Sequence, residues 1–235
     1  MREDQVIVTG ASRGIGAAVA SELDRRGWRV VGLSRSGESP AGRAQVCDVA
    51  DEAALRECIA AAAREGPVAG LVNNAGIHWS AKTAELQVDD YERVMAINAT
   101  SVMIASREAY PHLKRRGGGI IVNMGSFFDK FGVARNLPYT VSKAAIGAMT
   151  RVLAVEWARD GISVINVAPG YVRTDLSPEF WRNERSGEWL ADRVPLGRPG
   201  TSEEVARLVG AIYDESIPFL TGSTIYMDGG QGINH

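Results

Sequence analysis

A tyrosine and a lysine in the stretch PYTVSKAAIG, at 138–147, have a spacing that could support catalysis. A free tyrosine keeps its proton until about pH 10 and a free lysine until about pH 10.4, so neither alone is an effective acid or base near neutral pH. Tyr139 and Lys143 are four residues apart, and such positions share one face of a helix. A lysine cation within about 4–6 Å stabilises a phenolate and lowers the pKa of the tyrosine. The pair therefore predicts an acid/base group for a reaction at a substrate oxygen, such as reduction of a ketone.

Two further polar side chains could complete such a site. Ser126 follows an apolar run, and its hydroxyl can donate to the same substrate oxygen as a preorganised dipole. Asn98 lies inside a helical pattern at 93–102, where asparagine is a poor helix former. We expect Asn98 to kink that helix and to hold a water molecule linked to Lys143. Taken singly, these residues are more simply a packed tyrosine, a turn serine and a local helix irregularity.

A glycine-rich loop, TGASRGIG at 9–16, stands between a strand pattern and a helix pattern. Glycines there allow a tight turn and the approach of a pyrophosphate, and the helix N-terminus adds N–H groups and a favourable dipole. The spacing is GxxxGxG rather than GxGxxG, and a plain strand-to-helix turn is the alternative. The predicted cofactor contacts in this loop are Gly10, Ser12, Arg13, Gly14, Ile15 and Gly16.

The end of the second strand pattern bears on the choice between the two nicotinamide cofactors. An acid there would bind the ribose hydroxyls, whereas an arginine would accept a 2′-phosphate. The chain has Ser34 and Arg35, with no acid before Glu38, and Arg13 is a second cation within reach. We predict a preference for NADP(H), with NAD(H) left open; the alternative is two solvated arginines.

The elements that would position these residues alternate along the chain. Strand patterns are expected at 5–9, 28–34, 44–49, 70–76, 119–126, 162–170 and 223–230. Helical patterns are expected at 14–26, 52–64, 88–115 and 139–159. The strands are short, rich in Val and Ile, and apolar on both faces, which is typical of a parallel sheet covered on both sides. The alternation predicts one doubly wound α/β Rossmann domain over 1–235, with a seven-stranded parallel sheet and helices on both faces. In such sheets ligands bind outside the carboxyl ends of the strands, where six of the strand patterns bring the unusual residues.

Composition restricts the class of protein. The 235 residues are 45% hydrophobic and 23% charged, as in an ordinary globular protein, and the net charge of −2 argues against nucleic-acid binding. No apolar stretch approaches the roughly 18 residues of a membrane span, and no signal peptide is evident. We expect a cytoplasmic protein. Cys47 and Cys58 form no CxxC or Cys/His cluster, so we expect reduced thiols and no metal site.

Together these motifs resemble the short-chain dehydrogenase/reductase family, in the compact single-domain subgroup that includes 3-oxoacyl-carrier-protein reductases. The likeness runs from Val6 to Gly230. It rests on TGASRGIG, Asp48, NNAG at 73–76, Asn98, Ser126, YTVSK at 139–143, PG at 169–170, Thr174 and DGG at 228–230.

The resemblance implies a role for each matching position. Asn98, Ser126, Tyr139 and Lys143 correspond to the catalytic tetrad of the family, without departure. The other implied cofactor contacts are Asp48 and Val49 at the adenine, Asn74, Ala75 and Gly76 beside the ribose, Pro169 and Gly170, and Thr174 with the backbone of Val172 at the nicotinamide carboxamide. Tyr139 and Lys143 would also contact the cofactor.

The segment 176–196 is where the family carries its mobile substrate lid, and it holds several large apolar side chains in a polar stretch. The alternative is a helix that packs its apolar side on the body. Phe128 and Trp181 are the residues we expect to line the substrate pocket, which suggests an apolar or cyclic carbonyl substrate. His78 follows NNAG and could face the pocket, although a lone histidine is more often structural.

The sequence therefore predicts an oxidoreductase that interconverts a ketone and a secondary alcohol by hydride transfer, with tyrosine as acid/base. A 3-oxoacyl-carrier-protein reductase is the alternative within enzymes, with Arg182, Arg185 and Arg193 as its candidate carrier contacts. A non-catalytic protein that senses dinucleotides is the alternative of another class. The small residues after Lys143 favour a homodimer or homotetramer, with internal packing as the alternative.

Overall fold

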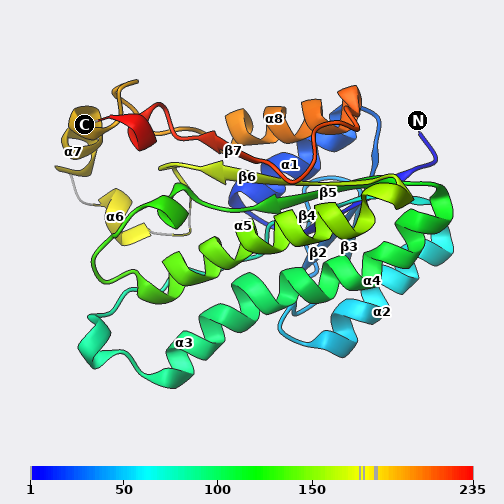
Figure 1. Ribbon diagram of the computed structural model, residues 1–235, viewed down its shortest axis with the longest axis horizontal. Coiled ribbons are helices and arrows are strands. Elements are labelled where there is room, and N and C mark those ends of the chain that lie inside the picture. Colours follow the sequence, from blue (N-terminus) through cyan, green and yellow to red (C-terminus); the bar gives the residue numbers. More distant parts are fainter. Residues whose placement is uncertain (1, 175, 177, 183–184, 235) are drawn as a thin grey trace.

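Seven parallel strands form one sheet at the centre of the computed structural model, which describes residues 2–174, 176, 178–182 and 185–234 (Figure 1). The strands are β1 Gln5–Thr9, β2 Arg29–Ser34, β3 Arg43–Val46, β4 Val68–Asn73, β5 Gly119–Met124, β6 Ile162–Pro169 and β7 Thr224–Met227. Their order is β3-β2-β1-β4-β5-β6-β7, and every neighbouring pair is parallel. The chain thus starts inside the sheet and builds outward in both directions, which confirms the predicted doubly wound class.

Helices cover both faces of this sheet. They are α1 Gly14–Arg25, α2 Glu52–Glu65, α3 Val88–Met95, α4 Ser101–Arg116, α5 Leu137–Trp157, α6 Pro178–Arg182, α7 Arg185–Arg193 and α8 Ser202–Glu215. In Figure 1, α1 and α8 lie above the sheet, and α2, α4 and α5 lie below it. Leu23 of α1 and Val209 of α8 are fully buried in the upper layer, as are Ile59 of α2 and Leu113 of α4 in the lower one. Two apolar layers therefore hold the sheet, as strands without a polar face require.

Several boundaries differ from the sequence prediction. The third strand ends at Val46 rather than 49, and the seventh ends at Met227, because Asp228 turns the chain by accepting hydrogen bonds from Gly230 N and Gly232 N. The predicted helix 88–115 is α3 and α4 joined through a π-helical turn. Residues 177, 183 and 184 of the predicted lid lie outside the described residues.

Helix α8 was missed from the sequence, although a signal for it is present. Thr201 accepts a hydrogen bond from Glu204 N, and the Glu204 carboxylate accepts one from Thr201 N, which is a complete capping box. Apolar residues then recur at helical spacing, and Val205 and Val209 are fully buried. The capping pair followed by this spacing was enough to predict the helix.

We expect Thr201→Ala to lower the free energy of unfolding by about 1 kcal/mol, because the amide of Glu204 loses its acceptor. Denaturant unfolding measures the change. Thr201→Ser is the matched control, since serine caps as well as threonine and should unfold as the wild type does. Equal unfolding free energies for the alanine and serine variants would contradict the capping argument.

Three asparagines stand in register across the centre of the sheet, Asn73 on β4, Asn123 on β5 and Asn166 on β6. The Asn73 amide donates to Asn123 Oδ1 over 2.8 Å, and Asn123 Nδ2 donates to Thr150 Oγ1 of α5 over 2.9 Å. Buried amides need such partners, so these bonds fix where α5 lies on the sheet. That helix carries Tyr139 and Lys143.

Candidate active site

A cavity of about 750 Å³ opens at the carboxyl ends of the strands, within the size range of small-molecule sites. Residues that follow each of the first six strands line it, as the sequence predicted. The predicted cofactor residues found in the lining are Gly10, Ser12, Arg13, Gly14, Ile15, Ser34, Arg35, Asp48, Val49, Asn74, Ala75, Gly76, Tyr139, Lys143, Pro169 and Thr174. Gly16, Gly170 and Val172 are not in the lining. Gly170 packs so closely on Asp228 that a Cβ would lie 2.7 Å from its Cα, and Val172 pairs with Gly200.

The loop after β1 needs its glycines for two different reasons. Gly10 and Gly14 have φ of +67° and +56°, which L side chains rarely adopt. Gly16 lies in the first turn of α1, where a Cβ would stand 2.1 Å from the carbonyl oxygen of Gly10. The side chain of the N-cap residue, Arg13, forms no capping hydrogen bond to the first amides of α1. This arrangement fits a pyrophosphate, which binds to free amides at a helix N-terminus.

Asn74 joins the glycine loop to the loop after β4. Its Nδ2 donates to Thr9 O over 3.0 Å, and Thr9 Oγ1 accepts from the backbone amides of Asn74 and Ala75. The side chains thus hold two walls of the cavity together. This reciprocal pairing suits the position beside a ribose that the resemblance implies for Asn74.

At the end of β2, the Ser34 hydroxyl forms hydrogen bonds to the backbone of its own loop. It donates to Glu38 O over 2.8 Å and accepts from Glu38 N over 3.0 Å, so the loop folds Glu38 back toward the strand end. Glu38 therefore lines the cavity with Arg13 and Arg35. Both guanidinium groups are exposed, and neither forms an ion pair with any residue that the structure describes. With Asp48 after the neighbouring β3, two cations and two acids therefore line this end of the cavity.

Beyond β3, Asp48 caps its own turn by accepting from Ala50 N over 3.0 Å. Cys47 also lines the cavity, which sequence reasoning missed. Its thiol is free, and burial raises its pKa to about 12, with Cys58 and nearby carboxylates acting in the same direction. A thiol with so high a pKa is inert, so Cys47 contributes an apolar surface here.

Tyr139 and Lys143 come together with Ser126 beneath the cavity. Helix α5 begins at Leu137 with Pro138 in its first turn, where proline is favoured, so Tyr139 and Lys143 occupy consecutive turns. The Lys143 ammonium donates to Met124 O over 2.8 Å and lies 5.6 Å from the centre of the Tyr139 ring. The Ser126 side chain interacts with the Tyr139 hydroxyl and acts to lower the pKa of the phenol. Three of the four predicted catalytic residues thus meet at one point.

Burial governs the pKa values of this pair. It raises the pKa of Tyr139 to about 12, against the hydrogen bond from Ser126, and lowers the pKa of Lys143 to about 8. The direction for Tyr139 is opposite to the one we expected from Lys143, because loss of hydration disfavours the phenolate more than its neighbours favour it. Lys143 remains mostly cationic at pH 7 and Tyr139 remains protonated, which suits a proton donor.

Asn98 does interrupt its helix, within the π-helical turn Ala96–Thr100. The side chain is fully buried; Oδ1 accepts from Ile77 N over 2.8 Å, and Nδ2 donates to Ile77 O and to Ser142 Oγ. Asn98 therefore joins the loop after β4 to helix α5. The contact on α5 is Ser142, the residue before Lys143. Both amide hydrogens are used, so the expected water link to Lys143 stays a prediction.

Aromatic rings surround the phenol of Tyr139. Phe128 is buried and meets the Tyr139 ring edge-on at 5.7 Å between centres, but it is not among the residues that line the cavity. Trp181 is more remote: it touches Phe180, which stacks on Tyr171 at 5.3 Å. Sequence reasoning missed Tyr171, which also contacts Phe128. An aromatic residue directly after the PG pair at the end of β6 was the available signal.

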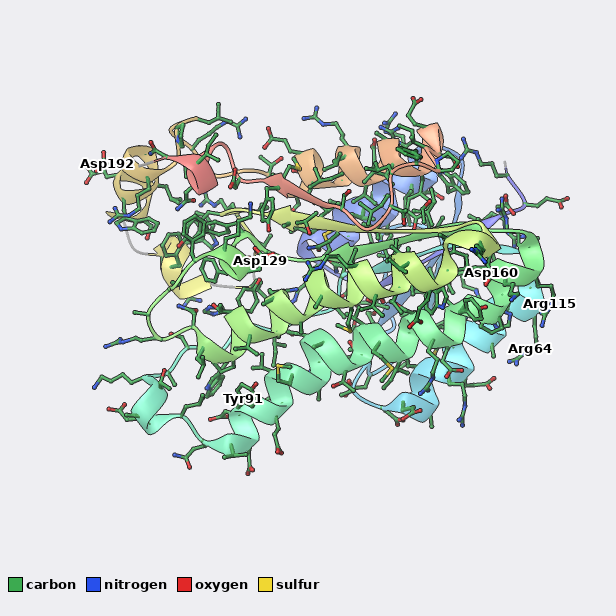
Figure 2. All side chains as sticks on the ribbon, in the orientation of Figure 1. Arg64, Tyr91, Arg115, Asp129, Asp160 and Asp192 are labelled. Carbon is green, nitrogen blue, oxygen red and sulfur yellow. The ribbon has the colours of Figure 1, made fainter. Side chains whose placement is uncertain are left out.

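The short helix after Ser126, Phe127–Lys130, is tied to β7 by Asp129 (Figure 2). Both carboxylate oxygens of Asp129 accept from the Tyr226 hydroxyl, at 3.1 and 3.0 Å, and burial raises the pKa of Asp129. The Lys130 ammonium lies 3.4 Å from the centre of the Tyr226 ring. These contacts fix the segment that carries Phe128.

A dinucleotide-sized cavity in a doubly wound sheet, with tyrosine, lysine and serine at its base, defines a class of oxidoreductases. The chain belongs to the short-chain dehydrogenase/reductase family. The family's sequence model described as enoyl-(acyl carrier protein) reductase matches residues 10–231. Its relatives are named dehydrogenases and reductases, so the chain is an enzyme of this family.

Among the relatives, gluconate 5-dehydrogenase of Gluconobacter oxydans is 33% identical over 96% of this chain and 93% of its own. A 3-oxoacyl-[acyl-carrier-protein] reductase of Mycobacterium bovis is also 33% identical, over 98% of this chain and 93% of its own. A solved gluconate 5-dehydrogenase of Burkholderia cenocepacia, in complex with NADP and tartrate, is 29% identical with a TM-score of 0.92, covering 100% of this chain and 97% of that one.

Within the described ranges, no helix combines the length and apolar character needed to span a bilayer. In the same part of the chain, no three His, Cys, Asp or Glu side chains gather as a metal site would require.

Proposed function

We propose that the protein interconverts a ketone and a secondary alcohol with a nicotinamide dinucleotide, and that NADP(H) is the preferred cofactor. The carrying observation is that Tyr139, Ser126 and Lys143 converge at the base of a cavity whose other end is a glycine loop. The family membership and the solved relative with bound NADP support the proposal.

Each catalytic side chain has a separate task in ketone reduction. Ser126 donates to the carbonyl oxygen and directs it toward Tyr139, as a preorganised dipole. Tyr139 gives its phenolic proton to that oxygen as negative charge develops there. Lys143, cationic and 5.6 Å from the ring centre, stabilises the phenolate that remains. Asn98 holds the loop after β4 against α5, which keeps these groups in place.

The cofactor supplies the two-electron transfer when it is bound. The glycine loop would hold its pyrophosphate, Asp48 and Val49 its adenine, and Thr174 with the backbone of Val172 its carboxamide. Arg13 and Arg35 would attract a 2′-phosphate, and Glu38 would oppose it. Both guanidinium groups are exposed and form no ion pair with any described residue, so they are available to a 2′-phosphate, which supports NADP(H).

An absorbance screen at 340 nm tests the proposed function. NADPH and NADH are offered in parallel with ketones, acyl thioesters and keto sugars, and the reverse reaction with alcohols. We expect turnover of ketones with a higher kcat/KM for NADPH. A complete lack of turnover across the panel would sink the proposed reaction and favour the non-catalytic sensor of dinucleotides.

Arg35 is the residue on which the cofactor preference depends most directly. We expect Arg35→Ala to raise the KM for NADPH roughly 10-fold, the size of one charge-assisted hydrogen bond, and to leave the KM for NADH unchanged. Steady-state kinetics with both cofactors measure it. Arg115→Ala is the control, because Arg115 lies in the last turn of α4, just before β5 begins, and is not among the residues that line the cavity. An equal change for both cofactors would refute a role in recognising the 2′-phosphate.

The acyl-carrier-protein alternative needs cations at the mouth of the pocket. Arg182 and Arg193 are exposed, but the Arg193 guanidinium lies over the Trp189 ring at 4.3 Å, and the side chain of Arg185 lies outside the described residues. Turnover of the acyl thioesters in the screen would distinguish an acyl-carrier-protein reductase from an enzyme that reduces small ketones.

A homodimer or homotetramer in the cytoplasm is the proposed assembly and location. Val152 and Val155 of α5 are 54% and 81% exposed, and Ala144 and Ala148 add small exposed residues to the same helix. Such a surface suits helix-to-helix docking between copies. Light scattering after size-exclusion chromatography measures the mass, and cell fractionation tests the location.

A further inference from the structure

His78 lies against the catalytic tyrosine. Its imidazole meets the Tyr139 ring edge-on, with 5.2 Å between ring centres and 68° between planes. The residue is half-buried and directly follows Ile77, which lines the cavity. Phe128 touches the same phenol at 5.7 Å. The phenol that would donate its proton to the substrate oxygen therefore has an imidazole and a benzene ring as immediate neighbours.

Two side chains fix the place of this imidazole. Asn98 clamps the backbone of Ile77 from both sides, by accepting from its N–H over 2.8 Å and donating to its C=O over 2.9 Å. Asn136, at the start of α5, lies with Oδ1 2.5 Å from His78 Nε2. An imidazole held at its backbone and at its tip is preorganised, as binding groups in active sites need to be.

The hydrogen bonds also determine which atom His78 offers. Asn136 Nδ2 donates to Ala134 O over 2.9 Å, which turns the carbonyl oxygen of the amide toward His78. In the neutral imidazole, Nε2 must then carry the proton and Nδ1 must carry the lone pair. Among the residues that the structure describes, none bonds to Nδ1, and this atom is not sealed from solvent.

We propose that His78 is a specificity-determining residue whose Nδ1 accepts a hydrogen bond from a hydroxyl on the carbon next to the reacting carbonyl. This assigns the substrate to the α-hydroxy ketones, and the product to vicinal diols. The inference rests on the proposed function and sharpens it, because the aromatic rings alone favour any apolar or cyclic ketone. A site that hydrogen-bonds a substrate hydroxyl discriminates against the analogue that lacks it, since its own polar atom is then left unpaired.

Two pairs of ketones test this substrate class: 2-hydroxycyclohexanone with cyclohexanone, and 3-hydroxy-2-butanone with 2-butanone. For each pair, the ratio of kcat/KM with and without the hydroxyl is measured with NADPH. His78→Phe should lower this ratio roughly 10-fold or more relative to wild type. Because the ratio is compared between the variant and the wild type, differences in intrinsic reactivity between the ketones cancel. Trp79→Phe, at the exposed neighbouring residue, is the control and should keep the wild-type ratio.

Two amide variants separate hydrogen bonding from packing. His78→Asn places an amide near the position of Nδ1 and should restore much of the hydroxyl preference, whereas His78→Gln places it near Nε2 and should not. A hydroxyl preference that is the same in wild type and His78→Phe overturns the inference and leaves the proposed ketone reduction standing. Failure of the wild type to reduce any of the four ketones overturns the inference, and the full absorbance screen then decides on the proposed function.

Discussion

Tyr139→Phe is expected to lower kcat for ketone reduction by roughly 10²–10⁴-fold, the usual contribution of a general acid. The substitution removes one oxygen. The ring keeps its edge-on contacts with Phe128 and His78, so packing under the cavity is preserved. The hydroxyl lost is the one that interacts with Ser126 and the one whose proton the proposed reaction needs. The effect should therefore fall on kcat, with little change in the affinity for NADPH.

Stopped-flow or steady-state absorbance at 340 nm measures kcat, and quenching of tryptophan fluorescence measures NADPH binding. Tyr91→Phe is the matched control, because Tyr91 lies on α3 away from the strand ends (Figure 2) and should keep wild-type kcat. If Tyr139→Phe turns over ketones nearly as fast as the wild type, another group supplies the proton. Loss of NADPH binding in step with kcat would instead assign Tyr139 a structural role.

The sequence predicted where Tyr139 and Lys143 lie better than it predicted their electrostatics. The spacing of Tyr139 and Lys143 places them on one helix face whatever surrounds the helix, so their meeting was predictable. The pKa of Tyr139 depends on how many atoms cover it, and those come from His78, from Phe128 and from Tyr171 packed behind Phe128, which belong to three separate parts of the sequence. Burial depends on the tertiary structure, which is why the expected direction of the shift in the Tyr139 pKa was wrong.

A similar limit applies at the end of β2. Ser34 and Arg35 were correctly placed in the cavity. Glu38 reaches the cavity only because two hydrogen bonds with the Ser34 hydroxyl fold the loop back toward the strand end. No periodic pattern encodes such a loop. Most strands, by contrast, were predicted because they contain a continuous apolar run, as in β2, β4 and β6, and only their ends, where polar side chains turn the chain, were misplaced.

The glycine loop provides the second large effect: Gly16→Ala is expected to weaken NADPH binding roughly 100-fold and to lower the free energy of unfolding by about 1–3 kcal/mol. A Cβ at this position would lie 2.1 Å from Gly10 O and 2.4 Å from Asn74 Nδ2. Neither neighbour can yield cheaply. Gly10 is held in a left-handed conformation with its amide on Leu33 O, and the Asn74 amide ties the loops after β1 and β4 together. The methyl group would therefore push the two walls of the cavity apart.

Titration with NADPH and denaturant unfolding, on the same preparations, measure the two effects. Gly147→Ala is the matched control, because Gly147 is also helical and a Cβ there would find its nearest neighbour, Arg151 Nη1, at an ordinary 3.7 Å. Alanine in that helix should gain about 0.5–1 kcal/mol from helix propensity and leave NADPH binding unchanged. Wild-type affinity in Gly16→Ala would mean that the pyrophosphate does not depend on the close approach of Gly16 to Gly10. A loss of stability without a loss of affinity would restrict Gly16 to packing, because binding at this loop requires the walls and the amides of α1 to hold their positions together.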